Sequence, residues 1–554
     1  MKASSLIFLL VLLLAGLPAS AADLVLYNGR VVTLEDDQPQ ASAVAVADGR
    51  IVYVGDDAGA LALSRPDSVV IDLEGRTLLP GFVDAHAHLR GIGERELTLN
   101  LEDARSIADL KARLAAWLAA HPEGPVTGRG WIETHWPDRR FPGRADLDAV
   151  APDRPVMLFR ADGHAAVVNS AALKAAGIGP GTEDPFGGEI VRTEDGEAYG
   201  VLIDAAMELA APVFAGSEGP QRAEAYRVAD RVYRQRGWTG IHNMSVAPAD
   251  VPLIERLSDQ GEIALRVYNS IDREGAENLL GSGPRRSANG RVMTRAVKLY
   301  MDGALGSLGA ALLEPYADHD GAGLVMMRED ETLPFLIWAL GHGVQINTHA
   351  IGDRGNRIVL DWYERAMKAV PPSARAIAEP RWRIEHAQVL DPADIPRFAA
   401  LGVIPSMQPS HAIGDLFFAP SRLGRDRLSG AYAWKSLLET GVIIACGSDA
   451  PVEKGDPLIE FYAAVARMSL DGYSDENWHQ EQAVDRMTAL RMLTLWPAVA
   501  SFAEDDLGSI RVGKQADFSL FSVDPLTVPV AEIPKGHALL TVIGGEIVWR
   551  AEGF

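Results

Sequence analysis

Between about residues 78 and 504, apolar segments of strand length alternate with helix-like segments. Helical patterns such as 223–236 and 332–341 separate the apolar segments, an order typical of parallel α/β folds. Eight segments qualify as strands, the number that closes a TIM (β/α)8 barrel. They end near His86, Asn243, Ser270, Met301, His349, His386, Gln408 and Asp449. We therefore predict an α/β fold centred on a (β/α)8 barrel.

The crossover after the first predicted strand is interrupted by a long segment, about 91–235. This segment has its own helical pattern over 107–120 and an apolar strand pattern over 156–160. Long loops that follow the carboxyl end of a barrel strand commonly cover the active site. We therefore predict an inserted subdomain at the barrel mouth.

The two ends of the chain, residues 22–77 and 505–554, have short β-like runs instead. Pairs such as Asn28-Gly29 and Asp48-Gly49 separate these runs and suit tight hairpin turns. Neither end alone has enough strands for a stable sheet. We expect both ends to pair into one composite β-sandwich beside the barrel.

The first 21 residues have the pattern of a secretory signal peptide. Lys2 provides a positive charge, residues 6–14 are apolar, and Ala19-Ser20-Ala21 fits a small-x-small cleavage site. The apolar run is shorter than the roughly 20 residues that span a bilayer. We predict cleavage near Ala21/Ala22 and a periplasmic or secreted protein without a membrane anchor.

The charge balance restricts the partners that we expect. The formal net charge is -23 and no long basic run occurs, so the protein repels nucleic acids and anionic membranes. A small-molecule substrate is the expected partner, and a homodimer is left open. The single cysteine, Cys446, allows no intramolecular disulfide and is expected to be a buried apolar side chain.

Chemistry-bearing side chains gather at the predicted strand ends. His86 and His88 are two residues apart on one strand, so both imidazoles point to the same side. With 13 His in the chain, about 0.3 such pairs arise by chance, and the pair alone is weak evidence. However, His349, His386 and Asp449 end three other strands, and Lys298 lies in an apolar strand where an unpaired ammonium is costly. Active sites of barrels are built at strand carboxyl ends.

Six phrases in these regions carry a family resemblance: LLPGFVDAHAHL, RADGHAAVVNSAAL, VKLYMDGALGS, NTHAIGDR, RIEHAQ and GSDAPV. Together with GKQADFSLF near the C-terminus, they resemble the amidohydrolase superfamily, and within it family 3, the YtcJ-like branch. The resemblance implies that His86, His88 and Asp449 bind one divalent ion and that His349 and His386 bind a second. Lys298, carboxylated on its amine, would bridge the two ions; an unmodified Lys298 would leave one ion.

The donor types agree with that implied site. Imidazole and oxygen ligands suit Zn²⁺, which is the ion we expect. A metal-activated hydroxide would attack a carbonyl, with Asp449 as general acid and base. Superfamily deaminases commonly have a Glu beside the fifth-strand His, and the stretch from Gln345 to Asp353 has none. This departure favours hydrolysis at an amide-type carbonyl over deamination of a base.

Further residues are expected around the substrate. His164, in the insertion, is a predicted catalytic residue, and Arg160, Asp162, Asp302 and Trp131 are predicted substrate contacts. A loop-stabilising role is the alternative for the Arg160–His164 motif, and a role in shaping its loop is equally open for Asp302. Ordinary packing is the alternative for Trp131, Trp136, Phe417 and Phe418. His242 is expected to be a core residue or to support a ligand.

These observations predict a hydrolase of a non-peptide carbon–nitrogen bond, such as an N-acyl, N-formyl or cyclic amide. Hydrolysis of an ester, lactone or carbamate at the same site is the alternative within the enzyme class. The alternatives outside it are an exported binding protein without turnover and a scaffold with a closed structural metal site.

Overall fold

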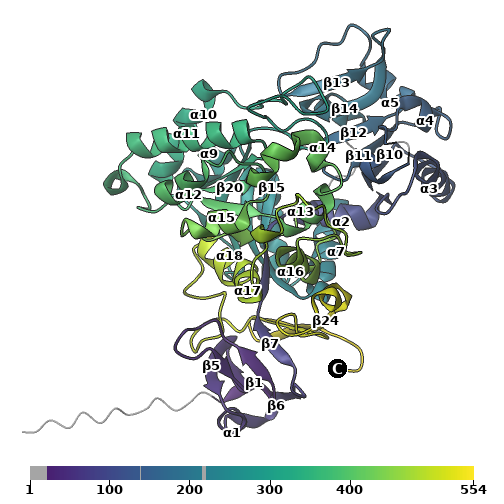
Figure 1. Ribbon diagram of the computed structural model, residues 1–554. Coiled ribbons are helices and arrows are strands. Elements are labelled where there is room, and N and C mark those ends of the chain that lie inside the picture. The colour runs from purple at the N-terminus through teal and green to yellow at the C-terminus, as the bar shows by residue number, and fades with distance from the viewer. Residues whose placement is uncertain (1–20, 138, 215–219) are drawn as a thin grey trace, which may run out of the picture.

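The computed structural model describes residues 21–137, 139–214 and 220–554, and its largest sheet is the predicted barrel (Figure 1). The eight barrel strands are parallel and neighbour one another in chain order. They are β8 (Phe82–Ala87), β15 (Trp238–Val246), β16 (Arg266–Asp272), β18 (Val292–Tyr300), β19 (Gln345–Ala350), β20 (Arg383–His386), β21 (Ile404–Met407) and β22 (Ala445–Cys446). Each predicted strand end lies within three residues of an observed one, so the barrel prediction is confirmed.

Helices cover the outside of the barrel, and the two predicted helical patterns fall inside α7 (Pro220–Arg236) and α10 (Glu329–His342) (Figure 1). The helix α11 (Asp353–Ala369) illustrates how they pack. Its residues Val359, Tyr363 and Ala366 are buried at a helical spacing, which forms an apolar stripe against the strands. The helices therefore cover the sides of the barrel, and the loops surround the strand ends.

The barrel closes between β22 and β8 through the residues that follow β22. The Asp449 amide donates to the His86 carbonyl (2.6 Å), and the His88 amide donates to the Ala450 carbonyl (2.8 Å). The segment approaches so closely that a Cβ on Gly447 would lie 2.3 Å from the His86 nitrogen. Gly447 is therefore required where the barrel closes, because a larger residue would clash with the backbone of β8.

The insertion forms a lobe with a six-stranded mixed sheet (Figure 1). Its strands, in sheet order, are β13 (Gly188–Arg192), β14 (Ala198–Asp204), β12 (Ala165–Val168), β11 (Val156–Arg160), β10 (Val126–Trp131) and β9 (Leu99–Asn100). The predicted helix and strand are confirmed as α3 (Ile107–Ala120) and β11. The helix begins where Ser106 accepts a hydrogen bond from the Asp109 amide, a normal N-cap.

The chain ends form two sheets at the far end of the barrel from the insertion (Figure 1). One sheet has the order β5 (Arg50–Gly55), β4 (Ala43–Ala47), β1 (Ala22–Tyr27) and β6 (Ser64–Asp72). The other has the order β25 (Glu546–Arg550), β24 (Ala538–Ile543), β23 (Phe518–Phe521), β7 (Thr77–Pro80), β2 (Arg30–Val32) and β3 (Gln40–Ala41). Leu26 and Leu78 share one apolar core with Phe518 and Val542, so the two ends are packed together as predicted.

The strand β6 escaped the sequence pattern because most of its side chains are exposed, Val69 and Val70 among them. The run 442–446 forms a strand only at Ala445–Cys446, and Cys446 is fully buried as expected.

The predicted export segment, apart from Ala21, lies outside the described residues. In the parts of the chain that are described, no helix has the length and apolarity to cross a membrane.

Candidate metal centre and active site

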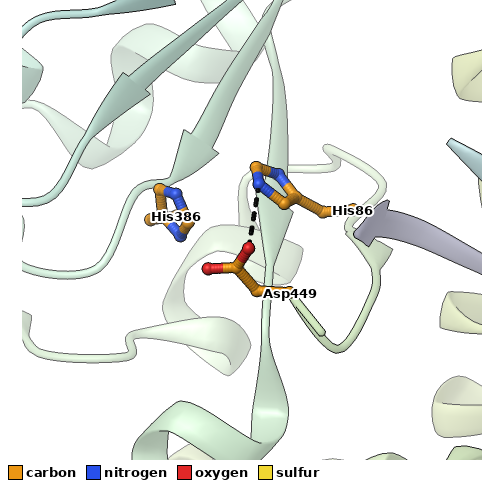
Figure 2. A group of neighbouring side chains, drawn as sticks. All are labelled: His86, His386 and Asp449. Atoms are coloured by element: carbon orange, nitrogen blue, oxygen red, sulfur yellow. Dashed lines mark ion pairs between the residues drawn. The ribbon is translucent and has the colours of Figure 1, made fainter. Parts of the chain in front are cut away.

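Three of the predicted ligands converge at the carboxyl ends of the barrel strands (Figure 2). His86, His386 and Asp449 each offer a nitrogen or oxygen atom, and these atoms all lie within 4.8 Å of one another. His86 Nε2 is 3.4 Å from Asp449 Oδ1. All three residues are buried. Two imidazoles and a carboxylate form a donor set that suits Zn²⁺ and similar divalent ions.

The backbone positions these side chains in two ways. His86 lies in β8, and His88 follows the end of that strand with a backbone that is still extended (φ -115°, ψ 91°), so alternation brings both to one side. Glu385 and His386 are consecutive, yet both side chains reach the site because His386 has a φ of 74°. Asp449 also has a positive φ, 57°. Such values are costly for residues other than glycine and occur often at functional sites, and here they direct two candidate ligands inward.

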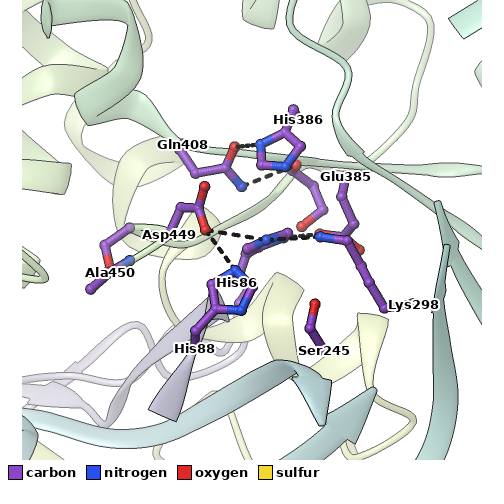
Figure 3. Close-up of polar contacts among 12 residues, drawn as sticks. His86, His88, Ser245, Lys298, Glu385, His386, Gln408, Asp449 and Ala450 are labelled. Carbon is purple, nitrogen blue, oxygen red and sulfur yellow. Dashed lines mark hydrogen bonds and ion pairs between the residues drawn. The ribbon is translucent and has the colours of Figure 1, made fainter. Parts of the chain in front are cut away.

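Hydrogen bonds orient the two buried imidazoles (Figure 3). His86 Nδ1 lies 2.5 Å from Glu385 Oε2, and His386 Nδ1 lies 2.8 Å from Gln408 Oε1. Both oxygens are acceptors, so each Nδ1 carries the proton and each Nε2 keeps its lone pair. A ligand imidazole bound to a metal is usually held in this way. His86 and His386 are therefore both oriented to bind a metal ion through Nε2.

His88 and Asp449 complete this side of the site. His88 Nε2 lies 3.2 Å from Asp449 Oδ1 (Figure 3). That oxygen is buried and makes no hydrogen bond to any described residue. An oxygen that faces two imidazole nitrogens without a hydrogen bond is well suited to a cation.

The electrostatics favour the protonation states that ligands need. Burial lowers the pKa of His86 and of His386 well below the usual value, so both imidazoles are neutral. Burial acts to raise the pKa of Asp449, but the neighbouring His86 and His88 outweigh it and hold that pKa well below its usual range. Neutral imidazoles and an ionised carboxylate are the metal-binding forms.

Lys298 lies beside this group on β18. Its side chain is buried, and its Nζ lies 3.2 Å from His86 Nε2. Burial lowers the pKa of the Lys298 amine to about 8. A substantial fraction of the amine is then neutral near pH 8, which is the form that reacts with CO₂.

His349 stands next to the compact group. Its ring centroid is 4.5 Å from that of His386, while its Nε2 faces the Gly303 carbonyl at 3.4 Å and Asp302 Oδ1 at 3.6 Å. The structure thus brings the predicted ligand to the site without placing it in the group of three.

Asp302 has the loop-shaping role of the two that were open for it, and not that of a substrate contact. Its carboxylate is fully buried and accepts hydrogen bonds from the amides of Ala311, Ile351 and Gly352. Burial raises the pKa of Asp302 to about 7. The carboxylate ties the loops after β18 and β19 together and faces His349, and it does not line the cavity described next.

A cavity of about 70 Å³ lies over the candidate ligands, between the barrel loops and the insertion. Arg160, Asp162 and His164 of the insertion line it, together with His349, His386 and Asp449 of the barrel. The insertion therefore does reach the barrel mouth, as predicted.

His164 forms a pair with Asp204 at the end of β14. His164 Nδ1 lies 2.5 Å from Asp204 Oδ1, and the His164 ring centroid is 5.0 Å from that of His349. Burial acts to lower the pKa of His164, but Asp204 raises it above the usual value. Asp204 has a φ of 46°, and a Cβ on Gly303 would lie 2.2 Å from its Oδ2. Glycine in the loop after β18 makes room for this carboxylate.

The positive charge of Arg160 is paired with carboxylates in the cavity wall. Its Nε donates to Glu133 (2.8 Å) and its Nη1 donates to Asp162 (2.5 Å). The guanidinium is buried. Arg160 therefore builds the wall with both carboxylates and offers no unpaired charge to a substrate.

The aromatic side chains divide between packing and the cavity. Trp131 is fully buried in the core of the insertion, where its indole N–H donates to the Leu158 carbonyl; this corrects the predicted substrate contact. Trp136 belongs to the same core. Phe418 lines the cavity, and Phe417 is an exposed side chain stacked on Tyr473.

Several residues of the site escaped the sequence-based prediction. Glu385 and Gln408 orient imidazoles, and both stood within or beside predicted strand ends, which was a usable signal. His242 was expected in a supporting role, and its Nδ1 is 2.8 Å from Arg383 Nη1, whose Nε lies 2.7 Å from Glu385 Oε1. Asp204 had no signal in the sequence, because only the folded insertion brings it to His164.

Comparisons with known proteins identify the family of the chain. A sequence profile described as the amidohydrolase family matches residues 69–549. A Bacillus subtilis protein named as an amidohydrolase, YtcJ, is 34% identical over 95% of this chain and 99% of its own. The N-substituted formamide deformylase of Arthrobacter pascens is 28% identical over 96% of this chain and 99% of its own.

Among solved structures, an uncharacterized metal-dependent hydrolase from Pyrococcus horikoshii is similar, with a TM-score of 0.73 and 26% identity. The match covers 92% of this chain and 99% of that one. The profile match and the solved structure agree with the barrel fold. The chain belongs to the amidohydrolase family, as a metal-dependent hydrolase that acts on carbon–nitrogen bonds.

Proposed function

We propose that this enzyme hydrolyses the amide bond of a small N-acyl or N-formyl compound. The observation that carries the proposal is the Asp449 carboxylate, which adjoins two oriented imidazoles and also lines the cavity. One carboxylate can therefore serve both the metal centre and the substrate. The relative from Arthrobacter pascens is named for a reaction of this class, which adds support.

His86, His88, His386 and Asp449 would hold one divalent ion, with zinc as the expected ion. Lys298, carboxylated on Nζ, and His349 would hold a second ion. A bound divalent ion would polarise the substrate carbonyl and make water a better nucleophile at neutral pH. All six side chains lie at strand carboxyl ends, where the barrel leaves room for a substrate.

Two side chains of this protein, Asp449 and His164, provide the proton transfers and the hydrogen bond that the reaction needs. Asp449 accepts a proton from the attacking water as the water oxygen bonds to the carbonyl carbon. His164, whose pKa Asp204 raises, donates in its protonated form a hydrogen bond from Nε2 to the carbonyl oxygen as negative charge develops there. When the C–N bond breaks, Asp449 returns the proton to the leaving amine.

A substrate panel with the zinc-loaded enzyme tests this function. N-formyl and N-acetyl amines, a lactone and an aryl ester would be compared by kcat/KM. Preference for the amides is expected, with Asp449→Asn lowering the rate at least 100-fold, in the range for loss of a general acid and base. Preference for the esters or lactone would favour that chemistry, and tight binding without turnover would overturn the enzymatic role.

We also propose that the chain is exported, with cleavage near Ala21/Ala22. The first strand, β1, begins at Ala22, so cleavage there leaves every described strand complete. Mass spectrometry of the protein purified from a host with a general secretion pathway tests this. A protein that keeps Met1, or remains in the cytoplasm, would contradict the proposal.

A further inference from the structure

The cavity over the metal centre is unevenly charged. Beyond the candidate ligand Asp449, three carboxylates line it: Asp162, Asp415 and Glu453. Asp162 is paired with Arg160, and Arg160 is paired again with Glu133. The remaining two, Asp415 and Glu453, form no ion pair with any Lys or Arg in the described ranges. The cavity wall therefore offers two carboxyl groups with which a cationic group of a ligand could pair.

The surroundings of these two groups explain why they are not neutralised internally. Asp415, at the end of α13 (Pro409–Asp415), accepts hydrogen bonds from the Gln388 amide (2.7 Å) and the Tyr432 hydroxyl, which are both uncharged donors. Arg129, the nearby guanidinium of the insertion, donates to the Ala161 carbonyl and does not line the cavity. Burial, reinforced by Asp415 and Asp449, raises the pKa of Glu453 to about 8. Without a bound cation Glu453 is therefore largely protonated near pH 7, and a cation beside it would favour its ionised form.

A second, independent feature indicates a ligand in the same place. His411, also on α13, is 8% exposed and lines the cavity, and its Nε2 is buried without a hydrogen-bond partner among the described residues. The nitrogen lies 3.7 Å from Asp449 Oδ2, beyond hydrogen-bond distance. Buried polar atoms are rarely left unpaired unless something else satisfies them.

We propose that the substrate carries a cationic group on its amine side, and that Asp415 and Glu453 bind this group while His411 hydrogen-bonds the amide being cleaved. The inference rests on the proposed amide hydrolysis and specifies its substrate class: N-formyl or N-acyl derivatives of diamines and of similar dibasic compounds. The net charge of -23 acts in the same direction, because it attracts cations to the protein.

Two formamides of matched length test the inference: N-formyl-1,4-diaminobutane, which is cationic, and N-formylpentylamine, which is neutral. The zinc-loaded wild type should prefer the cationic compound by about tenfold or more in kcat/KM, as expected for a partly buried charge pair. Glu453→Gln and Asp415→Asn should each reduce that ratio. Glu476→Gln, which removes a carboxylate that is 83% exposed, should leave the ratio unchanged.

Inhibition gives a second readout that does not require turnover. 1,4-Diaminobutane should compete with substrate more strongly than pentylamine, and the difference should shrink in Glu453→Gln.

The outcomes separate the two proposals. Hydrolysis of neither formamide, together with no turnover of the N-acetyl amines in the substrate panel, would overturn the proposed function. Equal hydrolysis of both, or a cationic preference that survives in both carboxylate variants, would overturn the assignment of a cation site to Asp415 and Glu453 and leave amide hydrolysis standing.

Discussion

The Ser448 hydroxyl donates a hydrogen bond of 2.5 Å to Asp84 Oδ2, which joins the last barrel strand to the first. The Ser448 amide donates to the other oxygen of Asp84 at 2.9 Å. Asp84 lies two residues before His86 and Ser448 lies directly before Asp449. The closure of the barrel and the geometry of two candidate metal ligands therefore depend on one buried carboxylate.

Asp84→Asn should weaken both stability and metal binding. The carboxylate also accepts from the Tyr233 hydroxyl at 2.9 Å and from the His86 amide at 3.2 Å, and an amide cannot accept all of these bonds. We expect the free energy of unfolding of the metal-free protein to fall by about 2–4 kcal/mol in urea titrations. Ser448→Ala removes one donor and should cost about 1 kcal/mol. Equal urea midpoints for Asp84→Asn and wild type would contradict the role of Asp84 in closing the barrel.

Glu385→Gln should reduce metal affinity without removing a ligand. The amide no longer provides a charged acceptor for His86 Nδ1, and loss of such a partner usually costs about 10–100-fold in affinity. Titration of the metal-free protein with Zn²⁺ against a chelator measures the change. The surface variant Glu476→Gln is the matched control, and it should bind zinc like wild type.

Lys298→Met should lower the number of bound ions from two to one per chain. Methionine keeps the length and apolar stem of lysine but cannot form a carbamate. Elemental analysis gives the ion count, and ¹³C NMR after incubation with labelled bicarbonate should show a carbamate signal only when Lys298 is present. Lys514→Met is the control, because Lys514 is also buried but lies away from the strand ends. An unchanged count in Lys298→Met would exclude the bridge.

Asp204→Asn should shift the pH dependence of kcat/KM. The Asp204 carboxylate makes the largest raising contribution to the pKa of His164, against the lowering effect of burial. Removing that carboxylate therefore lowers the pKa of His164. Protonated His164 is the active form, and activity therefore declines as pH rises through that pKa. The alkaline limb should move to lower pH in Asp204→Asn, with a larger relative loss at about pH 8 than at about pH 6. His164→Gln should lack this limb, and a profile that does not move would contradict the pairing.

Trp131→Phe should leave kcat/KM unchanged, because the indole lies in the core of the insertion and not in the cavity. The truncation Trp131→Ala should destabilise the insertion by about 3–5 kcal/mol. Limited proteolysis of the insertion and steady-state kinetics on the same preparations provide the measurements. A raised KM in Trp131→Phe with normal proteolysis would restore the role in substrate contact.

The sequence predicted what local periodicity determines. Alternation on one strand placed His86 beside His88, and the order of apolar segments predicted the strand ends that hold Lys298 and His349. It could not predict β6, whose side chains face solvent and leave no apolar alternation. It also could not predict the partners Asp204, His411 and Glu453, because their contacts join segments far apart in the chain. His386 turns inward because its φ is positive. The sequence could not predict this, because the residue type alone does not determine φ.

Asp84 and Ser448 are 364 residues apart in the chain, and the closure they form has a consequence for biogenesis. His86 leaves the ribosome long before Asp449, so the two ligands cannot meet during most of synthesis. The complete site forms only after the last barrel strand has joined the first. A chain translocated unfolded would therefore cross the membrane empty and take its metal from the compartment in which it folds, so the metal supply of that compartment would decide which ion the enzyme carries.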